Sequence, residues 1–122
     1  MDANVLQDKI DSLLDSVHKL LPSGGNSGDI YADELSLLNK SIHCLVRELH
    51  SQHGRTPEQE AALCLSLLMG YSVSRYANPE DESRKSAVLL RTRKILPLLP
   101  PSPLKERLLL IYNELQHSFS ID

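Results

Sequence analysis

Residues 56–71 decide the fold, and they read Thr56-Pro57-Glu58-Gln59-Glu60-Ala61-Ala62-Leu63-Cys64-Leu65-Ser66-Leu67-Leu68-Met69-Gly70-Tyr71. The first four residues are typical of a helix start, with Thr56 as N-cap, proline at the first helical position, an acid in the first turn and Gln59 as the reciprocal capping residue. The helix that follows is apolar on almost every side, so it is predicted to form the buried centre of the domain. Gly70 costs about 1 kcal/mol relative to alanine inside a helix. Its presence predicts that a neighbouring helix approaches closely at that point.

Two amphipathic helices are predicted before this stretch. Their apolar side chains recur at alternating spacings of three and four residues, which only a helix brings onto one face. The stripe consists of Leu6, Ile10, Leu13, Val17 and Leu20 in residues 4–21, and of Leu35, Leu38, Ile42, Leu45 and Leu49 in residues 32–53. Gly54 is predicted to end the second helix in a left-handed conformation.

Two further helices are predicted after the central one. Asn78-Pro79 is typical of a helix start and predicts a helix over residues 79–96, which Pro97 ends. Its apolar run Ala87-Val88-Leu89-Leu90 is contiguous, so no single buried face is assigned to it. Ser102 and Pro103 are predicted to start the last helix, which runs to about His117 with the stripe Leu104, Leu108, Ile111 and Leu115.

The sequence therefore predicts an all-α fold, a compact bundle of about five helices. We expect a single helical domain over residues 1–122. Its N-terminal helix, residues 1–21, is expected to be joined to the rest by the Gly/Ser-rich loop 22–30.

The composition fits a small helical protein that stays in the cytoplasm. Aromatic residues make up only 4% of the 122 residues, which favours helices over strands, since strands are usually enriched in aromatic side chains. The N-terminal helix is acidic and lacks the basic start and continuous apolar stretch of a signal peptide. The longest apolar-rich stretch, Ala61–Tyr71, is far shorter than the roughly 20 residues that cross a bilayer. We therefore expect a cytoplasmic protein without membrane association.

The side chains that suggest chemistry are better explained by structural roles. His50 and His53 share a helix face, but neither cysteine has a spacing that completes a four-ligand zinc site. Both histidines are instead predicted to act as cations at the carbonyl end of their helix. Cys64 lies in the most apolar helix, where burial opposes a nucleophilic thiolate, so Cys64 and likewise Cys44 are predicted to pack in the core. No catalytic, cofactor-binding or metal-binding residue is assigned, and the protein is not expected to be an enzyme.

Charge is distributed unevenly along the chain. The net charge is −3, yet residues 83–107 contain a single acid, Glu106, and the bases Arg84, Lys85, Arg91, Arg93, Lys94, Lys105 and Arg107. Three interpretations of this region are a solvated face with cations at helix ends, a docking surface for an acidic partner, and a nucleic-acid site. Because no aromatic residues alternate with the bases and the rest of the chain is acidic, direct binding of RNA or DNA is not expected.

The central run Glu60–Tyr71 resembles the corresponding segment of the UpxZ family. Further resemblance lies in His53-Gly54-Arg55-Thr56 with Glu58, and in Leu104-Lys105-Glu106-Arg107-Leu108-Leu109. The order of a short helix, a loop, a helix ending in Leu-x-x-x-His-Gly and an apolar helix also fits, over about residues 5–115. The resemblance implies a protein of the capsular polysaccharide loci of Bacteroides. Such a protein inhibits, in trans, the UpxY proteins of other loci, which are NusG-like transcription antiterminators.

The resemblance carries over no binding residues, so the interface is predicted from charge. The last two helices are expected to present it, with these side chains available to steer association: Arg84, Lys85, Arg91, Lys94, Lys105 and Arg107. Two alternatives stay open. One is a generic helical adaptor or dimerisation module with an unrelated partner, and the other is a helical RNA-binding factor that uses the basic region 84–107.

Overall fold

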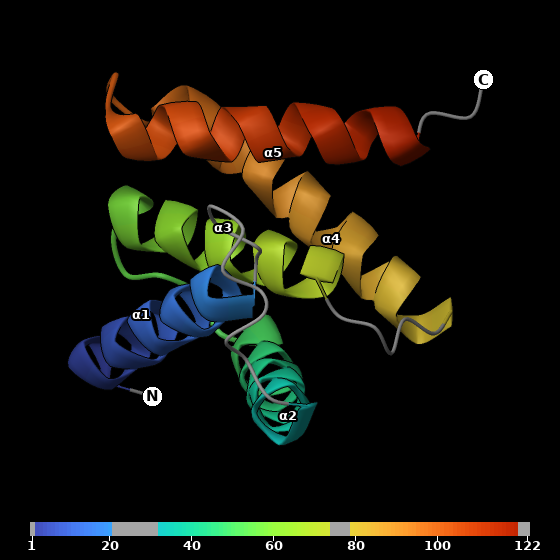
Figure 1. The fold of residues 1–122 in the computed structure, drawn as a ribbon. Helices are drawn as coiled ribbons and strands as arrows, with labels where there is room; N and C mark the ends of the chain where they lie inside the picture. Colours follow the sequence, from blue (N-terminus) through green and yellow to red (C-terminus); the bar gives the residue numbers. More distant parts are fainter. Residues whose placement is uncertain (1, 21–31, 74–78, 120–122) are drawn as a thin grey trace.

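The computed structural model describes residues 2–20, 32–73 and 79–119, which form five α-helices and a short 3-10 helix (Figure 1). The elements are α1 (Ala3–Leu20), α2 (Ala32–His50), α3 (Pro57–Val73), α4 (Pro79–Ile95), η2 (Leu96–Leu98) and α5 (Pro103–Phe119). The part of the chain described contains no strand, so the predicted all-α fold is confirmed. The loop predicted over residues 22–30 and the predicted N-cap Asn78 lie outside the described residues. None of the described helices is long and apolar enough to cross a membrane.

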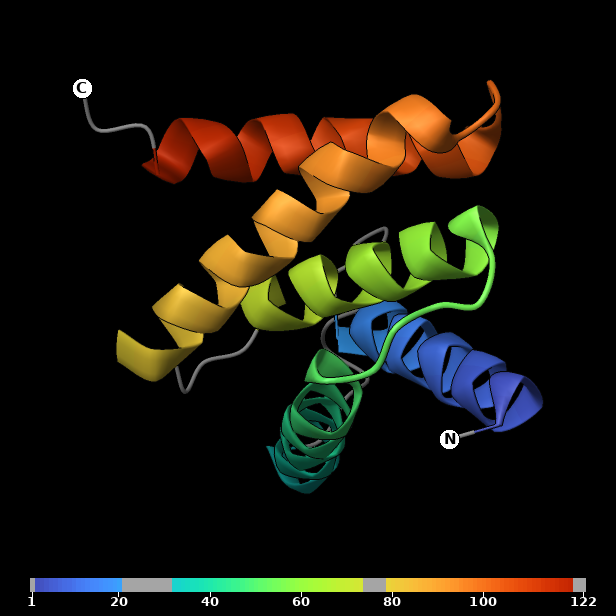
Figure 2. The same cartoon turned by 180° about the vertical axis from the view of Figure 1, so that it is seen from behind.

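α3 lies at the centre of the molecule and contacts all four other α-helices. α1 and α2 lie on one side of it, and α4 and α5 on the other (Figures 1 and 2). Every residue from Leu63 to Leu68 is buried, including Ser66, whose hydroxyl donates to the carbonyl oxygen of Leu63 at 2.8 Å. Because side chains all around the helix are buried, the predicted central position of α3 is confirmed.

α1 and α2 turn their apolar stripes toward α3 and toward each other. The buried residues of α1 are Leu6, Ile10, Leu13 and Val17, each at most 2% exposed. α2 buries Ile42, Val46 and Leu49, and Leu45 packs partly buried against them. An ion pair between Lys9 and Glu48 joins the outer surfaces of the two helices. The predicted residues Leu6, Ile10, Leu13, Val17, Ile42 and Leu49 are therefore confirmed as core. On α2 the core also includes Val46, which was not in the predicted stripe, whereas the predicted Leu38 is only half-buried. The side chains of Leu20 and Leu35 lie outside the described part of the chain.

Two glycines mark places where backbone segments approach closely. A methyl group at Gly70 would lie 2.5 Å from Cγ2 of Val46, so the predicted close approach of a neighbouring helix is confirmed, and the neighbour is α2. Gly54 does not adopt a left-handed φ, and α2 already ends at His50, so the predicted helix cap at Gly54 is wrong. A Cβ at Gly54 would instead overlap the backbone nitrogen of Glu60, because the chain passes directly against the start of α3.

α4 and α5 cover the opposite side of α3. α4 buries Val88, Leu89 and Thr92, whereas Leu108 is the one buried residue of the described α5 side chains. η2 and the proline-rich connector turn the chain back, and the two helices diverge from that point (Figures 1 and 2). α5 starts as predicted, because Ser102 Oγ accepts a hydrogen bond from the backbone N–H of Lys105 at 3.2 Å.

Candidate protein-binding surface

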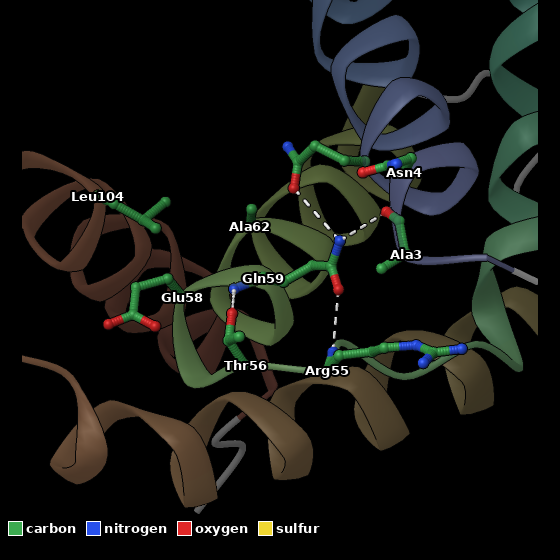
Figure 3. Close-up of a pocket in the computed structure, with 9 residues that line it drawn as sticks. Ala3, Asn4, Arg55, Thr56, Glu58, Gln59, Ala62 and Leu104 are labelled. Carbon is green, nitrogen blue, oxygen red and sulfur yellow. Dashed lines mark hydrogen bonds between the residues drawn. The ribbon is translucent and has the colours of Figure 1, made fainter.

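A crevice of about 470 Å³ lies where the N-terminal ends of α1, α3 and α5 meet (Figure 3). Gln59 occupies its centre. The Gln59 side chain donates from Nε2 to the carbonyl oxygen of Ala3 at 3.0 Å and accepts from the N–H of Arg55 at 2.9 Å, while its backbone N–H donates to Thr56 Oγ1 at 3.1 Å. The predicted capping box is thus present, with its reciprocal bond made to Arg55 in place of Thr56. These hydrogen bonds cap α3 and attach α1 to it.

Arg91 connects α4 to the other side of the molecule. Its guanidinium forms a bidentate pair with Glu60, with Nε and Nη2 each 3.0 Å from a carboxylate oxygen. It also donates to the carbonyl oxygens of His50, at 3.0 Å, and Gln52, at 2.7 Å. Glu60 in turn accepts from the N–H of Gly54 at 2.8 Å. The Arg91 side chain is only 17% exposed, so this predicted docking residue is held within the fold.

The same junction determines the charge of His50. Tyr71 Oη lies 2.9 Å from its Nδ1. Burial, and then the charges of Arg91 and Arg84, lower the pKa of His50 below its usual 6.5, so the ring is neutral at pH 7. The prediction that His50 acts as a cation at the helix end is therefore wrong. Arg91 supplies that positive charge, directly to the carbonyl group of His50.

The two cysteines have different environments. Cys64 is fully buried, which confirms its predicted place in the core, and burial raises the pKa of its thiol to about 11. Cys44 is exposed, so the prediction that it packs in the core is wrong. Its position on α2 is opposite the buried stripe that contains Ile42 and Val46. Among the described residues, no group of three His, Cys, Asp or Glu side chains is placed to hold a metal ion.

The other predicted docking residues differ in exposure. Lys85 is 15% exposed at its side chain and lies 3.9 Å from Glu82, and Arg84 is also partly buried. Lys105 is partly buried too, because its Nζ donates to the carbonyl oxygen of Leu99 at 3.1 Å. Exposed bases on this side of the molecule are Arg93, Lys94 and Arg107. The structure therefore brings Lys94 and Arg107 to the surface and adds Arg93, which is not in the predicted set.

An open groove of about 290 Å³ lies between α4 and α5. This α4–α5 groove is lined by Ser86, Leu89, Leu90, Arg93, Tyr112 and Gln116. Leu90 is 59% exposed, and Tyr112 is partly buried. The groove was not predicted from the sequence. The contiguous apolar run Ala87–Leu90 did carry a signal for it, because a helix cannot turn four consecutive side chains toward one face, so part of the run must face outward.

The opposite side of the molecule carries the acids of α1, of which Asp15 pairs with Lys19 at 3.1 Å. On α1 the exposed residues include Asp8, Asp11 and Asp15. Most of α1 lies across α3 from α4 and α5, so the uneven charge of the sequence becomes an asymmetry between two sides of the fold (Figure 1). The two sides meet where Arg107 Nη2 of α5 lies 3.4 Å from Nε2 of His18 on α1. A molecule with this arrangement is suited to orient a charged partner as it approaches.

Two comparisons with known proteins give matches. A family model described as the UpxZ family of transcription anti-terminator antagonists matches residues 10–114. The crystal structure of a transcription anti-terminator antagonist UpxZ from Bacteroides uniformis has 34% sequence identity to the chain and a TM-score of 0.77. That match covers 93% of this chain and 73% of the other. No curated protein matches the chain significantly.

Proposed function

The chain belongs to the UpxZ family of transcription anti-terminator antagonists, and we propose that its targets are NusG-like anti-terminators of the UpxY type. In this proposal it acts in the cytoplasm and in trans, on the anti-terminators of other capsular polysaccharide loci, so that one capsule is made at a time. The observation that carries the proposal is the family match over residues 10–114, supported by the similarity of the whole fold to a UpxZ structure.

Inhibition of this kind requires binding and no bond-making chemistry. A stable interface buries roughly 800 Å² on each partner. We place it on α4 and α5, where Lys94 and Arg107 are exposed and steer an acidic partner. Arg84, Lys85 and Lys105 add positive potential from partly buried positions. Arg91 contributes indirectly, because its pair with Glu60 holds α4 against α3.

Charge reversal on the two sides of the molecule tests this proposal. Purified UpxY-type anti-terminators are expected to bind the wild-type chain in surface plasmon resonance. The variant Lys94→Glu/Arg107→Glu is expected to associate more slowly by about tenfold at low salt, because exposed charges act mainly on the association rate. The control Asp8→Lys/Asp11→Lys changes the net charge by the same amount in the opposite direction, on α1, and is expected to associate as fast as wild type or faster.

Two results would contradict the proposal at different levels. Equal slowing by both double variants would show that the interface does not lie on α4 and α5. If none of the UpxY-type proteins bound the wild-type chain, the proposed target would be wrong.

A further inference from the structure

We propose that the α4–α5 groove receives an amphipathic helix of the anti-terminator, with apolar side chains inserted between Leu90 and Tyr112 and acidic side chains beside Arg93. This inference rests on the proposed function and names the part of the partner that binds. Three properties of the groove support it: its shape, its apolar walls and its isolated positive charge.

The shape of the groove suits side chains from a helix. α4 and α5 are close together near η2 and diverge from there (Figure 2). The groove is an open wedge lined by residues 86–93 of α4 and 112–116 of α5. Its volume of about 290 Å³ is at the lower end of the roughly 300–1,000 Å³ found for small-molecule pockets. A third helix laid along such a wedge fills it with a few side chains, which is a common mode of peptide recognition.

Exposed apolar side chains are concentrated on this part of the fold. Among the described residues, four of the six exposed large apolar side chains belong to α4, η2 and α5: Leu90, Leu98, Leu109 and Leu110. Leu90 lines the groove at 59% exposure. Leu109, 42% exposed, lies one helical turn before Tyr112 on the same face of α5 and extends the apolar wall. A partner that covers both leucines removes apolar surface from water.

The charge of the groove selects an acidic occupant. Arg93 is the charged residue of its lining, and it forms no ion pair within the described part of the chain. Lys94 follows it on the exposed surface. A carboxylate on the incoming helix would pair with Arg93 at the rim, where a charged pair fixes orientation and register.

The N-terminal helices of a second copy of this chain fit the groove less well. The apolar stripes of α1 and α2 are already buried in their own core, from Leu6 to Val17 and from Ile42 to Leu49. The exposed side of α1 carries acids but only Val5 as a large apolar residue. Among the described side chains of α1 and α2, the exposed large apolar residues are Val5 and Leu37, one on each helix. Neither helix therefore offers an apolar stripe, and the occupant is assigned to the partner protein.

Substitutions at two leucines, one inside the groove and one outside it, test whether the groove binds the partner. Leu90→Glu places a charge in the groove, whereas Leu110→Glu places one on an exposed position of α5 that does not line it, at 66% exposure. Both variants are expected to keep the wild-type melting temperature within a few degrees, since both sites are exposed. In titration calorimetry with a UpxY-type anti-terminator that binds wild type, Leu90→Glu is expected to weaken binding about 10- to 100-fold, and Leu110→Glu less than about threefold.

Photo-crosslinking identifies the occupant. Benzoylphenylalanine at position 109 is expected to crosslink to one segment of the anti-terminator. That segment should have apolar residues at helical spacing with Asp or Glu between them. Benzoylphenylalanine at position 110 is expected to give little crosslinked product. Crosslinking to a strand, or to a second copy of this chain, would overturn the assignment. If the anti-terminator bound Leu90→Glu as tightly as wild type, the groove proposal would be wrong while the proposed function stood. If no UpxY-type protein bound wild type, both would fail.

Discussion

The N-terminal region, α1 to α3, and the C-terminal region, α4 and α5, use their leucines differently. In the N-terminal region the apolar stripes are enclosed, as with Ile10 and Leu68, which are both 0% exposed. In the C-terminal region the stripe of α5 is mostly half-buried, and Leu90 and Leu110 face solvent at 59% and 66%. The apolar stripes of the first region are thus packed in the interior of the domain, whereas the second region has leucine side chains that remain exposed to solvent.

This difference shows how one small fold separates stability from recognition. The central part of α3, from Leu63 to Leu68, is buried on all sides and offers no surface for a partner. α4 and α5 each have one face on the core and another face outside it, and the second face combines leucines with bases. The ion pair between Glu60 of α3 and Arg91 of α4 connects the two regions. The position of the exposed face of α4 therefore depends on the buried helix α3.

The largest expected effect comes from breaking this connection. Glu60→Ala leaves the Arg91 guanidinium without its carboxylate and the N–H of Gly54 without its acceptor. Removing one partner of a buried ion pair costs about 3–5 kcal/mol, so the free energy of unfolding in urea should fall by that amount. The matched control Glu58→Ala, at an exposed position two residues away, should stay within about 0.5 kcal/mol of wild type. Similar values for the two variants would show that the regions are held together elsewhere.

A smaller effect is expected from overfilling the N-terminal region. Gly70→Ala adds a methyl group 2.5 Å from Cγ2 of Val46, which is buried and cannot move away. Overpacking costs about 1–3 kcal/mol, and better helix propensity returns at most about 1 kcal/mol, so a net loss of about 1–2 kcal/mol should appear in urea unfolding. In a Val46→Ala background the same change should become neutral or stabilising. Stabilisation in the wild-type background would contradict the close packing of α2 on α3.

The smallest effect concerns pH and the side chain of His50. Its pKa is lower in the folded than in the unfolded protein, so the unfolded chain binds more protons below pH 6.5. The free energy of unfolding should therefore fall as pH decreases from 7 through 6.5, and His50→Gln should reduce this dependence between pH 7 and 5.5. An unchanged pH dependence in His50→Gln would show that His50 is not the responsible group.

Sequence reasoning succeeded where one local signal determines the structure. The helix starts at Thr56 and Ser102 were predicted because capping depends on residues three positions apart. The core of α1 was predicted because its stripe is regular. Gly70 was correctly assigned to a close approach, since no other local reason for a glycine exists in that helix.

Sequence reasoning failed where residues far apart in the chain meet. Arg91 belongs to a run of bases, and only the fold shows that Glu60, 31 residues earlier, neutralises it. The lowered pKa of His50 comes first from burial and then from that same arginine, so it was also missed. The α4–α5 groove depends on how two helices diverge, which no spacing within either helix encodes. The predicted basic interface therefore stays a prediction, with Arg91 explained by the fold and Arg93 added from the groove.

Amide hydrogen exchange of the chain with and without a bound UpxY-type anti-terminator tests the division between the two regions most directly. The account predicts added protection in residues 82–94 of α4 and 105–116 of α5, and unchanged exchange in α1 and in residues 37–50 of α2. Added protection confined to α1 and α2, with α4 and α5 unchanged, would contradict it.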